Sequence, residues 1–505
     1  MSRNPGTSVF DVALNNNGTV DVQAGTLRLV GGGDSTGSFT VAAGAILIFT
    51  SATFVLRPAA QVSGAGNVAF GSSLSDGGLT FVNVLGTYDI GGQTSFVNGT
   101  ANFIRNGSTG TATFSGGTLT GLGDFTVTGL LNSMSGTMSG TGRTFANGGM
   151  QIGSGGSGGL TLDGRALDNA GRAVLVGGLS LSNGAAFNNR ETGTFDIQGG
   201  NGVGSFGFLG TFNNAGLLVK SSGAGTTTVS PRFNNTGSVR VDTGMLALTG
   251  PFTNFSPGTG MLAGGSYILL GTLQFTNAHL VSNAATVVLA GPSARIVNQS
   301  GADALADFAS NTAAGDFTLQ GGRNLTVPGL FRNTGRLVID AGSTFTAADG
   351  YAQADGLTVL LGGSLAAPLV DVQGGAFAGT GVVLGSVRNA GLFLVGGSGA
   401  AGVLEITGDF LQTETGTLEL DIGGLAAGTQ HDQLRVAGAA ALDGTLAIGL
   451  LDGFFASLGD GFRVLAFGSR TGDFAARRGL DIGGGLLFEP LYDDTGLTLL
   501  TVPAP

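Results

Sequence analysis

Apolar and polar residues alternate over short stretches along most of the chain, as in SVRVDTGMLAL (238–248) and LRLV (27–30). A period of two is that of a β-strand, in which successive side chains point to opposite faces. Gly and Asn separate these stretches, and helical spacing is nearly missing apart from one short turn expected in ADALADFAS (302–310). The pattern predicts an all-β protein made of many short strands.

The strands recur with a fixed phrase, an apolar residue followed two positions later by Asn. The intervals between eight successive asparagines are 22, 20, 25, 21, 19, 23 and 21 residues, which indicates a repeat array. Looser copies occur at Asn16, Asn83, Asn98, Asn333 and Asn389. The eight pairs are Phe145/Asn147, Leu167/Asn169, Phe187/Asn189, Phe212/Asn214, Phe233/Asn235, Phe252/Asn254, Phe275/Asn277 and Ile296/Asn298.

A unit of about 22 residues with two or three short strands and Gly or Asn at its corners describes one coil of a parallel β-helix, or β-solenoid. A leucine-rich repeat has a similar period, but it would need its own leucine frame around the asparagine and usually a helical return. The sequence therefore predicts stacked β-coils.

Stacking gives the repeated phrase a structural meaning. Successive coils lie about 4.8 Å apart, so equivalent side chains lie above one another. The eight apolar members are expected to form a core stack, because each ring or branched chain buries a large apolar area. The eight asparagines are expected to form a buried ladder at a corner, tolerating a left-handed backbone and bonding to the main chain. The Gly two residues later is expected to provide a positive φ.

Composition supports a folded and turn-rich chain. Gly supplies 97 of 505 residues without a three-residue period, and charged residues make up 10%, against about 25% in typical soluble domains. Cys is absent, which excludes disulfides and thiolate metal sites. A net charge of −11 argues against nucleic acid as a partner. No signal peptide is recognisable at the N-terminus.

The uncharged stretch from Ser35 to Leu56 resembles a membrane span in length only. It is rich in Ser, Thr and Gly, and its apolar residues come in short β-branched and aromatic groups around Gly44. A transmembrane helix needs about 20 mostly apolar residues. The pattern predicts successive β-strands here, and the chain is not expected to span a membrane.

The composition changes near residue 400. Asn389 is the last asparagine, and the segment from Ala401 holds 14 of the 32 acidic residues with five arginines, a net charge of 5 − 14 = −9. We therefore predict two domains: a β-solenoid repeat domain over 1–400 and an acidic, Asn-free β cap module over 401–505.

The cap module carries a resemblance to a known group of proteins. The segments GVLEITGDFLQTETGTLELDIGG (402–424), HDQLRVAGAAALDGTLAI (431–448), LGDGFRVLAFGSRTGDF (458–474) and LLFEPLYDDTGLTLLTV (486–502) resemble the C-terminal module of bacterial secreted β-helical surface proteins, of the autotransporter-passenger or exosortase-sorted (PEP-CTERM) type. The terminal TVPAP resembles the start of such a sorting signal, with Ala504 where Glu is expected. The resemblance implies an extracellular, structural or adhesive role and brings no catalytic residues.

The search for chemistry yields no catalytic, cofactor-binding or metal-binding residues. The two histidines, His279 and His431, fall on either side of residue 400, and His431 lies beside Asp432 in a phrase that we interpret as structural. No HExxH, P-loop or supported GxSxG motif occurs, and aspartates do not recur at the nine-residue interval of a calcium roll. No cofactor is expected.

These observations favour a non-enzymatic extracellular structural protein, a component of a cell surface or biofilm matrix. The first coil is expected to present open strand edges, which could be covered by a missing upstream domain or by a second copy that stacks head to tail into fibres. A monomeric adhesin stalk is the first alternative, and a polysaccharide lyase or hydrolase on a β-helix is the second. An ice-binding or carbohydrate-binding module also stays open. The expected partners are the chain itself and an extracellular polysaccharide or cell surface.

Overall fold

The computed structural model describes residues 6–73, 78–155, 157–397 and 399–505. These residues form a parallel β-solenoid with about 19 turns of about 21 residues, which confirms the predicted fold and nearly the predicted period. No helix occurs in the described chain, and thus none that is long and apolar enough to cross a membrane. Ser35–Leu56 contains the strands β5 (Ser38–Val41), β6 (Ile46–Phe49) and β7 (Thr53–Leu56), as the sequence predicts.

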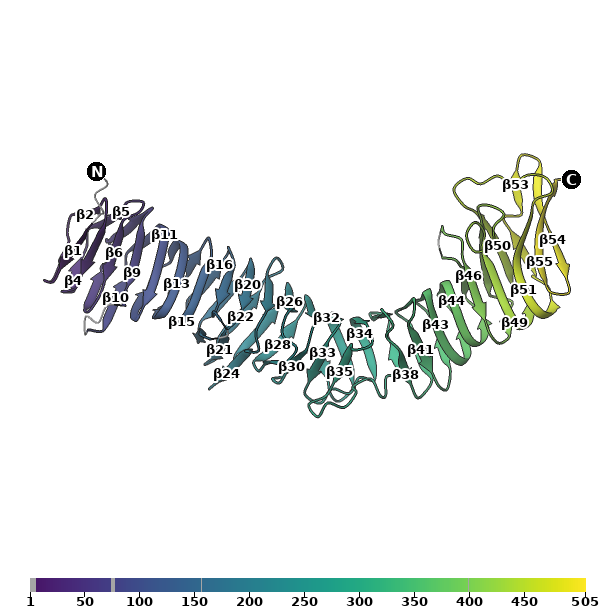
Figure 1. The fold of residues 1–505 in the computed structure, drawn as a ribbon, viewed down its shortest axis with the longest axis horizontal. Helices are drawn as coiled ribbons and strands as arrows, with labels where there is room; N and C mark the ends of the chain where they lie inside the picture. Colours follow the sequence, from purple (N-terminus) through teal and green to yellow (C-terminus); the bar gives the residue numbers. More distant parts are fainter. Residues whose placement is uncertain (1–5, 74–77, 156, 398) are drawn as a thin grey trace. The chain divides into compact units, whose positions relative to one another are not determined.

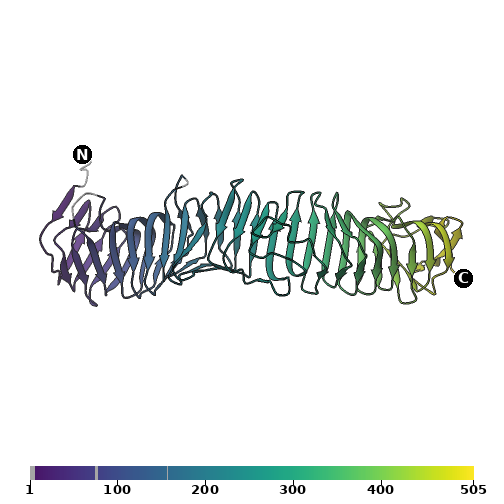
Figure 2. The ribbon, with the colours of Figure 1, turned by 90° about the horizontal axis from the view of Figure 1, so that it is seen from below.

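The chain divides into two compact units, which are described separately. Unit 1 comprises Met1–Thr253 with Leu273–Thr276, and unit 2 comprises Asn254–Thr272 with Asn277–Pro505. In each unit the coils stack so that equivalent strands pair in parallel and build three sheets (Figures 1 and 2). We call the sheet that carries the buried asparagines the ladder sheet. The second and third sheets follow it in chain order within each coil.

Most strands in unit 1 each lie entirely within one of the three sheets. The ladder sheet contains β2 (Thr19–Val22), β5 (Ser38–Val41), β8 (Gln61–Gly64), β14 (Phe125–Val127), β16 (Arg143–Ala146), β19 (Ala166–Asn169), β22 (Ala186–Asn189), β25 (Thr211–Asn214) and β28 (Arg232–Asn235). The second sheet contains β1 (Thr7–Phe10), β3 (Thr26–Leu29), β6 (Ile46–Phe49), β9 (Asn67–Phe70), β17 (Met150–Ile152), β20 (Arg172–Leu175), β23 (Thr194–Ile197), β26 (Leu217–Lys220) and β29 (Ser238–Val241). The third sheet contains β4 (Gly33–Ser35), β7 (Thr53–Leu56), β10 (Thr80–Val84), β12 (Gly99–Phe103), β18 (Gly159–Asp163), β21 (Gly178–Ser182), β24 (Val203–Phe206), β27 (Thr226–Val229), β30 (Met245–Leu248) and β33 (Thr272–Phe275). Three longer strands bend from one sheet into the next: β11 (Thr87–Val97), β13 (Gly107–Thr120) and β15 (Leu131–Ser139).

Unit 2 repeats the plan with longer strands. The ladder sheet contains β36 (Ser310–Asn311), β39 (Phe331–Asn333), β42 (Tyr351–Gln353) and β47 (Phe410–Gln412). The second sheet contains β37 (Asp316–Gln320), β40 (Arg336–Asp340), β45 (Leu392–Val395), β48 (Thr417–Ile422), β50 (Thr445–Leu450) and β52 (Ala476–Arg478), and the third contains β38 (Leu325–Val327), β41 (Thr344–Ala347) and β46 (Val403–Ile406). Strands that bend through two or three sheets are β32 (Met261–Leu269), β34 (Ser282–Ala290), β43 (Leu357–Val372), β44 (Ala376–Asn389), β49 (Gln433–Leu442) and β51 (Gly461–Gly472). The short strands β31 (Phe255–Ser256) and β35 (Arg295–Val297) complete the stack.

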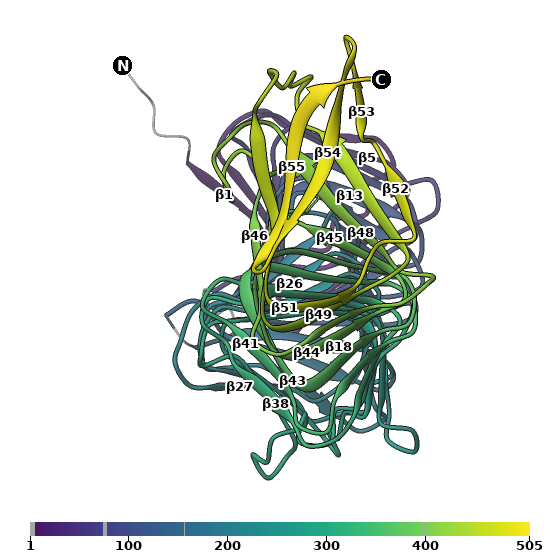
Figure 3. The same ribbon diagram turned by 90° about the vertical axis from the view of Figure 1, so that its right-hand side faces the viewer.

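The composition change near residue 400 does not interrupt the stack. Parallel pairing continues from β44 to β46 and from β45 to β48 across that point. After residue 400, antiparallel pairing between strands begins where β55 (Gly496–Pro503) lies along β51, followed by β54 (Leu486–Asp493) and β53 (Asp481–Gly483). The strands that cap the coils are therefore a smaller part of the chain than the predicted 401–505 module. Figure 3, in which the C-terminal strands face the viewer, shows β54 and β55 side by side.

The interior of unit 1 contains the predicted column of rings. Phe187, Phe212 and Phe233 pair in register and are fully buried, with ring centroids 4.9 and 5.7 Å apart. Phe252 continues the column 6.0 Å from Phe233 and 5.1 Å from Phe275, although Phe252 is partly exposed. Leu167 lies in register below Phe187. Ile296 is buried in unit 2.

We expect Phe212→Ala to lower the free energy of unfolding of unit 1 by about 3–5 kcal/mol, because the substitution would leave a cavity between the rings of Phe187 and Phe233. Urea denaturation monitored by hydrogen exchange in β22, β25 and β28 measures the change. Phe206→Ala is the matched control, since Phe206 belongs to the same unit but is 65% exposed. Equal effects of the two substitutions would contradict the column as a source of stability.

Candidate functional site

A ladder of buried side-chain amides runs along the ladder sheet in unit 1. Asn169 donates from Nδ2 to Oδ1 of Asn189 at 2.9 Å, Asn189 donates to Asn214 at 2.8 Å, and Asn214 donates to Asn235 at 2.8 Å. All four side chains are at most 2% exposed. The bonds join successive coils, so each asparagine fixes the position of the next.

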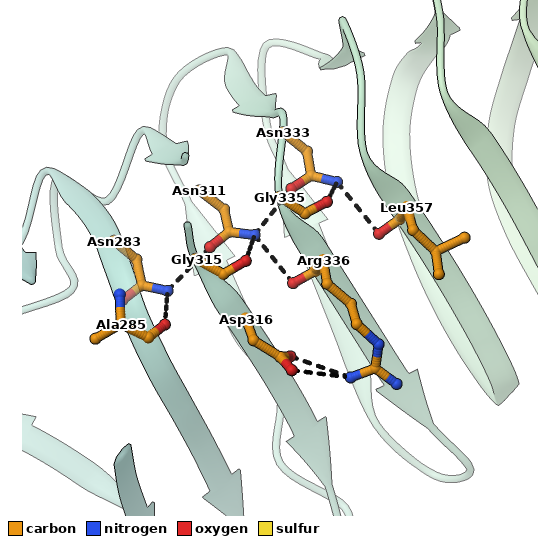
Figure 4. Close-up of polar contacts among 9 residues, drawn as sticks. All are labelled: Asn283, Ala285, Asn311, Gly315, Asp316, Asn333, Gly335, Arg336 and Leu357. Atoms are coloured by element: carbon orange, nitrogen blue, oxygen red, sulfur yellow. Dashed lines mark hydrogen bonds and ion pairs between the residues drawn. The ribbon is translucent and has the colours of Figure 1, made fainter. Parts of the chain in front are cut away.

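Unit 2 contains an equivalent ladder, drawn in Figure 4. Asn283 donates to Asn311 and Asn311 to Asn333, each at 2.9 Å, and Asn311 also donates to the Arg336 carbonyl at 3.0 Å. Farther along, Asn389 donates to Oε1 of Gln412 at 2.8 Å. The asparagine ladder that the sequence predicts is thus confirmed as a motif, with glutamine as an occasional replacement.

The glycines beside the ladder are required for space rather than for a positive φ, which corrects the expectation from sequence. Gly216 and Gly237 have no positive φ angle. A Cβ atom added to Gly216 would lie 2.1 Å from the Gly193 carbonyl oxygen, and one added to Gly315 would lie 2.2 Å from Oδ1 of Asn311. Coils approach so closely at this corner that no side chain larger than hydrogen fits.

Phe145 and Asn147 lie outside the predicted column and ladder. In β16 the register places Thr144 against Leu167 and Ala146 against Asn169, so Phe145 points outward and Asn147 is exposed. The interior position is occupied by Thr144 because its hydroxyl accepts a hydrogen bond of 2.8 Å from Nε of the buried Arg165. The predicted register is therefore wrong by one residue in this coil.

Asn254, Asn277 and Asn298 serve turns instead of the unit 2 ladder. Asn254 is partly exposed and donates to the Ala263 carbonyl at 2.9 Å, and Asn298 accepts the backbone N–H of Ser300 at 2.9 Å. Asn277 is exposed with φ 56°, and it is the only one of the eight predicted ladder residues in the left-handed region. The prediction missed Asn283 and Asn311, which are 28 residues apart and outside its period. The apolar-x-Asn phrase at Val281–Asn283 could have indicated the first of them.

A second amide ladder, which the sequence analysis missed, lies on the outer face of the same strands in unit 1. Asn213 donates to Asn188 at 2.8 Å, Asn234 donates to Asn213 at 2.6 Å, and the Thr253 hydroxyl donates to Asn234 at 2.6 Å. The phrase Phe-Asn-Asn therefore supplies one amide to the interior and one to the surface. The second Asn of each pair was predicted, but the first was not.

The outer ladder begins at a carboxylate held by two arginines. Asp168 accepts from Asn188 and forms ion pairs with Arg143 at 3.0 Å and Arg190 at 2.8 Å. Burial alone would raise the pKa of Asp168, but the hydrogen bonds from Arg190, Asn188 and Arg143 outweigh burial and hold this pKa below its usual value. Asp168 therefore stays ionised and has no free role as a proton donor.

Two buried cations satisfy backbone carbonyls where coils change shape. The Arg165 guanidinium is fully buried and donates to the carbonyls of Gly123 at 2.9 Å and Arg143 at 3.0 Å. Burial lowers the pKa of Arg165 to about 10. Lys220, the only lysine of the chain, donates from Nζ to the carbonyls of Ser222 and Gly223 at 2.9 Å each. Both side chains are bound to the protein's own backbone.

The two histidines lie in unrelated surroundings. His279 is exposed and pairs with Asp307 at 2.8 Å. His431 is 2% exposed, with Nδ1 2.9 Å from the Gly424 carbonyl and its ring edge-on to Phe462 at 5.6 Å between ring centroids. The described partners of the two histidines are thus a surface carboxylate in one case and a backbone carbonyl and an aromatic ring in the other.

Among the described carboxyl groups of the C-terminal coils, that of Asp432 has the most strongly shifted pKa. It is fully buried, and it accepts the backbone N–H groups of Gly402 and Asp421 at 2.7 Å each. Burial, assisted by the nearby charges of Asp421 and Glu419, raises the pKa of Asp432 to about 7. A general acid could have such a pKa, but a substrate cannot reach a carboxyl that is closed off and bound to two backbone amides. We interpret Asp432 as structural.

One groove in unit 2, of about 480 Å³, combines charged walls with a small-residue floor. Arg435 and Arg463 line it together with Ala437, Ala466 and Gly468. Arg435 pairs with Glu405 at 3.2 Å and Arg463 pairs with Asp493 at 3.0 Å. Because each guanidinium group is already paired with a carboxylate, neither is left as an unpaired charge for a ligand to bind.

Within the described ranges, no group of three His, Cys, Asp or Glu side chains is arranged to hold a metal ion. No model of a known protein family matches the chain, and a search of curated proteins finds no match. The described geometry is thus the basis for a functional proposal, and the interactions between coils are its most extensive feature.

We expect Asn214→Leu to lower the free energy of unfolding of unit 1 by about 1–3 kcal/mol, because Asn189 and the Ser238 carbonyl would each lose a buried hydrogen-bond partner. The measurement is the midpoint of thermal or urea unfolding. Asn147→Leu is the control, since Asn147 is exposed and lies outside the ladder. Unchanged midpoints for Asn214→Leu would exclude the ladder as a stabilising element.

The raised pKa of Asp432 predicts that the C-terminal coils lose stability as the pH rises. Between the unfolded value near 3.8 and the folded value of about 7, the native state holds a proton that the unfolded state has released. The free energy of unfolding should fall over this window, by up to about 1.4 kcal/mol per pH unit. Asp432→Asn should flatten the slope, whereas Asp494→Asn, at an exposed position, should preserve it. A slope unchanged by Asp432→Asn would refute the assignment.

Proposed function

We propose that this protein is a non-enzymatic structural component of an extracellular surface or matrix, and that it assembles end to end into fibres. The observation that carries the proposal is the pair of amide ladders in unit 1. In the same strands, the inner asparagines (Asn169 to Asn235) and the outer asparagines (Asn188 to Asn234) form hydrogen bonds with neighbouring coils. Surface side chains that bond to neighbouring coils hold the stack together. This arrangement suits a solenoid that bears mechanical load better than an enzyme.

The surroundings of the titratable groups support the non-enzymatic part of the proposal. Asp168 is neutralised by Arg143 and Arg190, and Asp432 is enclosed by backbone amides. Glycoside hydrolases need two carboxyl groups facing one bond, about 5–10 Å apart with room for a sugar between them. Neither carboxyl is available for such a pair. A polysaccharide lyase or hydrolase therefore remains the weaker candidate.

The extracellular location is supported by the sequence. The segments from Gly402 to Val502 resemble the C-terminal module of secreted bacterial β-helical proteins, and a cysteine-free chain with 10% charged residues is in keeping with that class. An extracellular polysaccharide or cell surface is accordingly the proposed environment.

A monomeric adhesin stalk is a second candidate that one surface feature favours. The end of β24 and the loop that follows it expose two aromatic rings, Phe206 at 65% and Phe208 at 80%, and the adjacent Leu209 at 42%. Exposed apolar side chains that gather on one loop are typical of contact sites. An adhesive contact by this loop would be compatible with the stalk and with the fibre.

We expect the protein on the outside of the producing cell. Proteinase K added to intact cells should remove it, and immunogold labelling should place it at the surface or in the surrounding matrix. Purified protein should leave pectins, alginate and other uronic-acid polymers unchanged in reducing-end and unsaturated-product assays. An intracellular, protease-protected protein would contradict the proposed location. Turnover that a single carboxylate substitution abolishes would favour the enzyme.

A further inference from the structure

Among the residues that the structure describes, two strands of the first coil of unit 1 have a strand partner on one side. β1 lies along β3 with Phe10 opposite Leu29, and β2 lies along β5 with Val22 opposite Val41. Interior strands such as β3 have a neighbour on each side, β1 and β6. Every residue of β1 is exposed. Phe10 is 46% exposed although it occupies the column of Leu29, which is 1% exposed.

The last coil of unit 2 also presents two open strands. Its third sheet is closed because β55 pairs antiparallel with the first half of β51 (Figure 3). The outer half of β51, residues 469–472, lies along β49, and β52 lies along β50. All residues of these two segments are exposed.

The open strands at the two ends belong to the same two sheets. In unit 1, β1 begins the second sheet and β2 begins the ladder sheet. In unit 2, β52 ends the second sheet and the outer half of β51 ends the ladder sheet. A first coil placed on a last coil would therefore offer each open strand a partner from its own sheet, in the parallel pairing used between coils. The closed third sheet needs no partner.

The open strand segments at the two ends carry opposite charge. Residues 6–25 include Asp11 and Asp21 and no Lys or Arg. Residues 469–478 include Arg470, Arg477 and Arg478 with one acid, Asp473, although the segment from Ala401 as a whole is strongly acidic. All six of these aspartate and arginine residues are exposed. Arg477 is already paired with Asp473, and Arg470 lies over the Tyr492 ring, 4.0 Å from its centroid. Charged side chains on an open strand edge disfavour pairing with most other strands. They allow pairing with an edge that carries the opposite charge.

From this match we propose that copies of the chain bind head to tail. β1 of one copy adds to β52 of the next, and β2 adds to the outer half of β51. Asp11 and Asp21 face the arginines at 470 and 478, and the contact covers Val9 and Phe10, which are 52% and 46% exposed. This contact is heterologous, so it propagates into a filament rather than closing as a dimer. The inference rests on the proposed structural role and names the second copy as the partner.

Charge reversal tests the contact on the 505-residue chain. A tail variant carries Arg470→Glu and Arg478→Glu, and a head variant carries Asp11→Arg and Asp21→Arg. By light scattering and electron microscopy, the unaltered chain should grow beyond dimers as its concentration rises, and growth should weaken with salt. Each variant alone should stay monomeric. An equimolar mixture of the two should recover growth, because each basic end then meets an acidic end.

The recovery in the mixture separates a lost contact from a misfolded variant. The control carries Arg105→Glu and Arg332→Glu, two exposed arginines away from both ends with the same change in net charge, and it should assemble like the unaltered chain. A chain that stays monomeric at every concentration would overturn the inference. So would a dimer that persists in the tail variant, which indicates head-to-head pairing. A monomer that is nevertheless found at the cell surface would remove this interface and leave the structural role as an adhesin stalk.

Discussion

Parallel pairing in register between neighbouring coils is the constraint on which the structure depends. Coils separated by the spacing of β-strands place each side chain directly against its counterpart. A column of identical groups is stable only if the group can interact favourably with itself. Phenylalanine does so through ring contacts, as at Phe187, Phe212 and Phe233. Asparagine does so because its amide has a donor at one end and an acceptor at the other, as in the ladder from Asn169 to Asn235.

The same constraint explains the surface and its low charge. Charged groups of like sign stacked at strand spacing repel one another. Neutral amides and hydroxyls do not, and the outer ladder from Asn188 through Asn234 to Thr253 uses them. Where a charge enters a column it is compensated from neighbouring coils, as Arg143 and Arg190 compensate Asp168. A protein with 10% charged residues is thus the expected product of stacking, independent of any ligand.

The buried ionisable groups lie where regular stacking gives way to corners and loops. At such places backbone groups lack a partner in the next coil, and a buried polar group without a hydrogen bond is costly. Arg165 and Lys220 supply donors to carbonyl groups, and Asp432 supplies acceptors to the amides of Gly402 and Asp421. The cost of burying each charge appears as a shifted pKa: lowered in the two cations and raised in the carboxylate.

The sequence by itself determined the fold class, the length of the coil and the ladder from Asn169 to Asn235. Stacked coils require Phe and Asn at equivalent positions, so the length of a coil is visible as the interval between these residues. The sequence did not determine which side of a strand faces the interior in each coil. A shift of one residue exchanges the two faces, and pairing with β14 and β19 together with the buried Arg165 places Thr144, and not Phe145, on the inner side. The tertiary structure alone identified Asn283 and Asn311 as ladder residues across a 28-residue interval. It also placed Asn254, Asn277 and Asn298 in turns, since a turn and a ladder can use the same phrase. Which sheets remain open at the ends was decided by pairings between strands far apart in sequence, which a local pattern does not record.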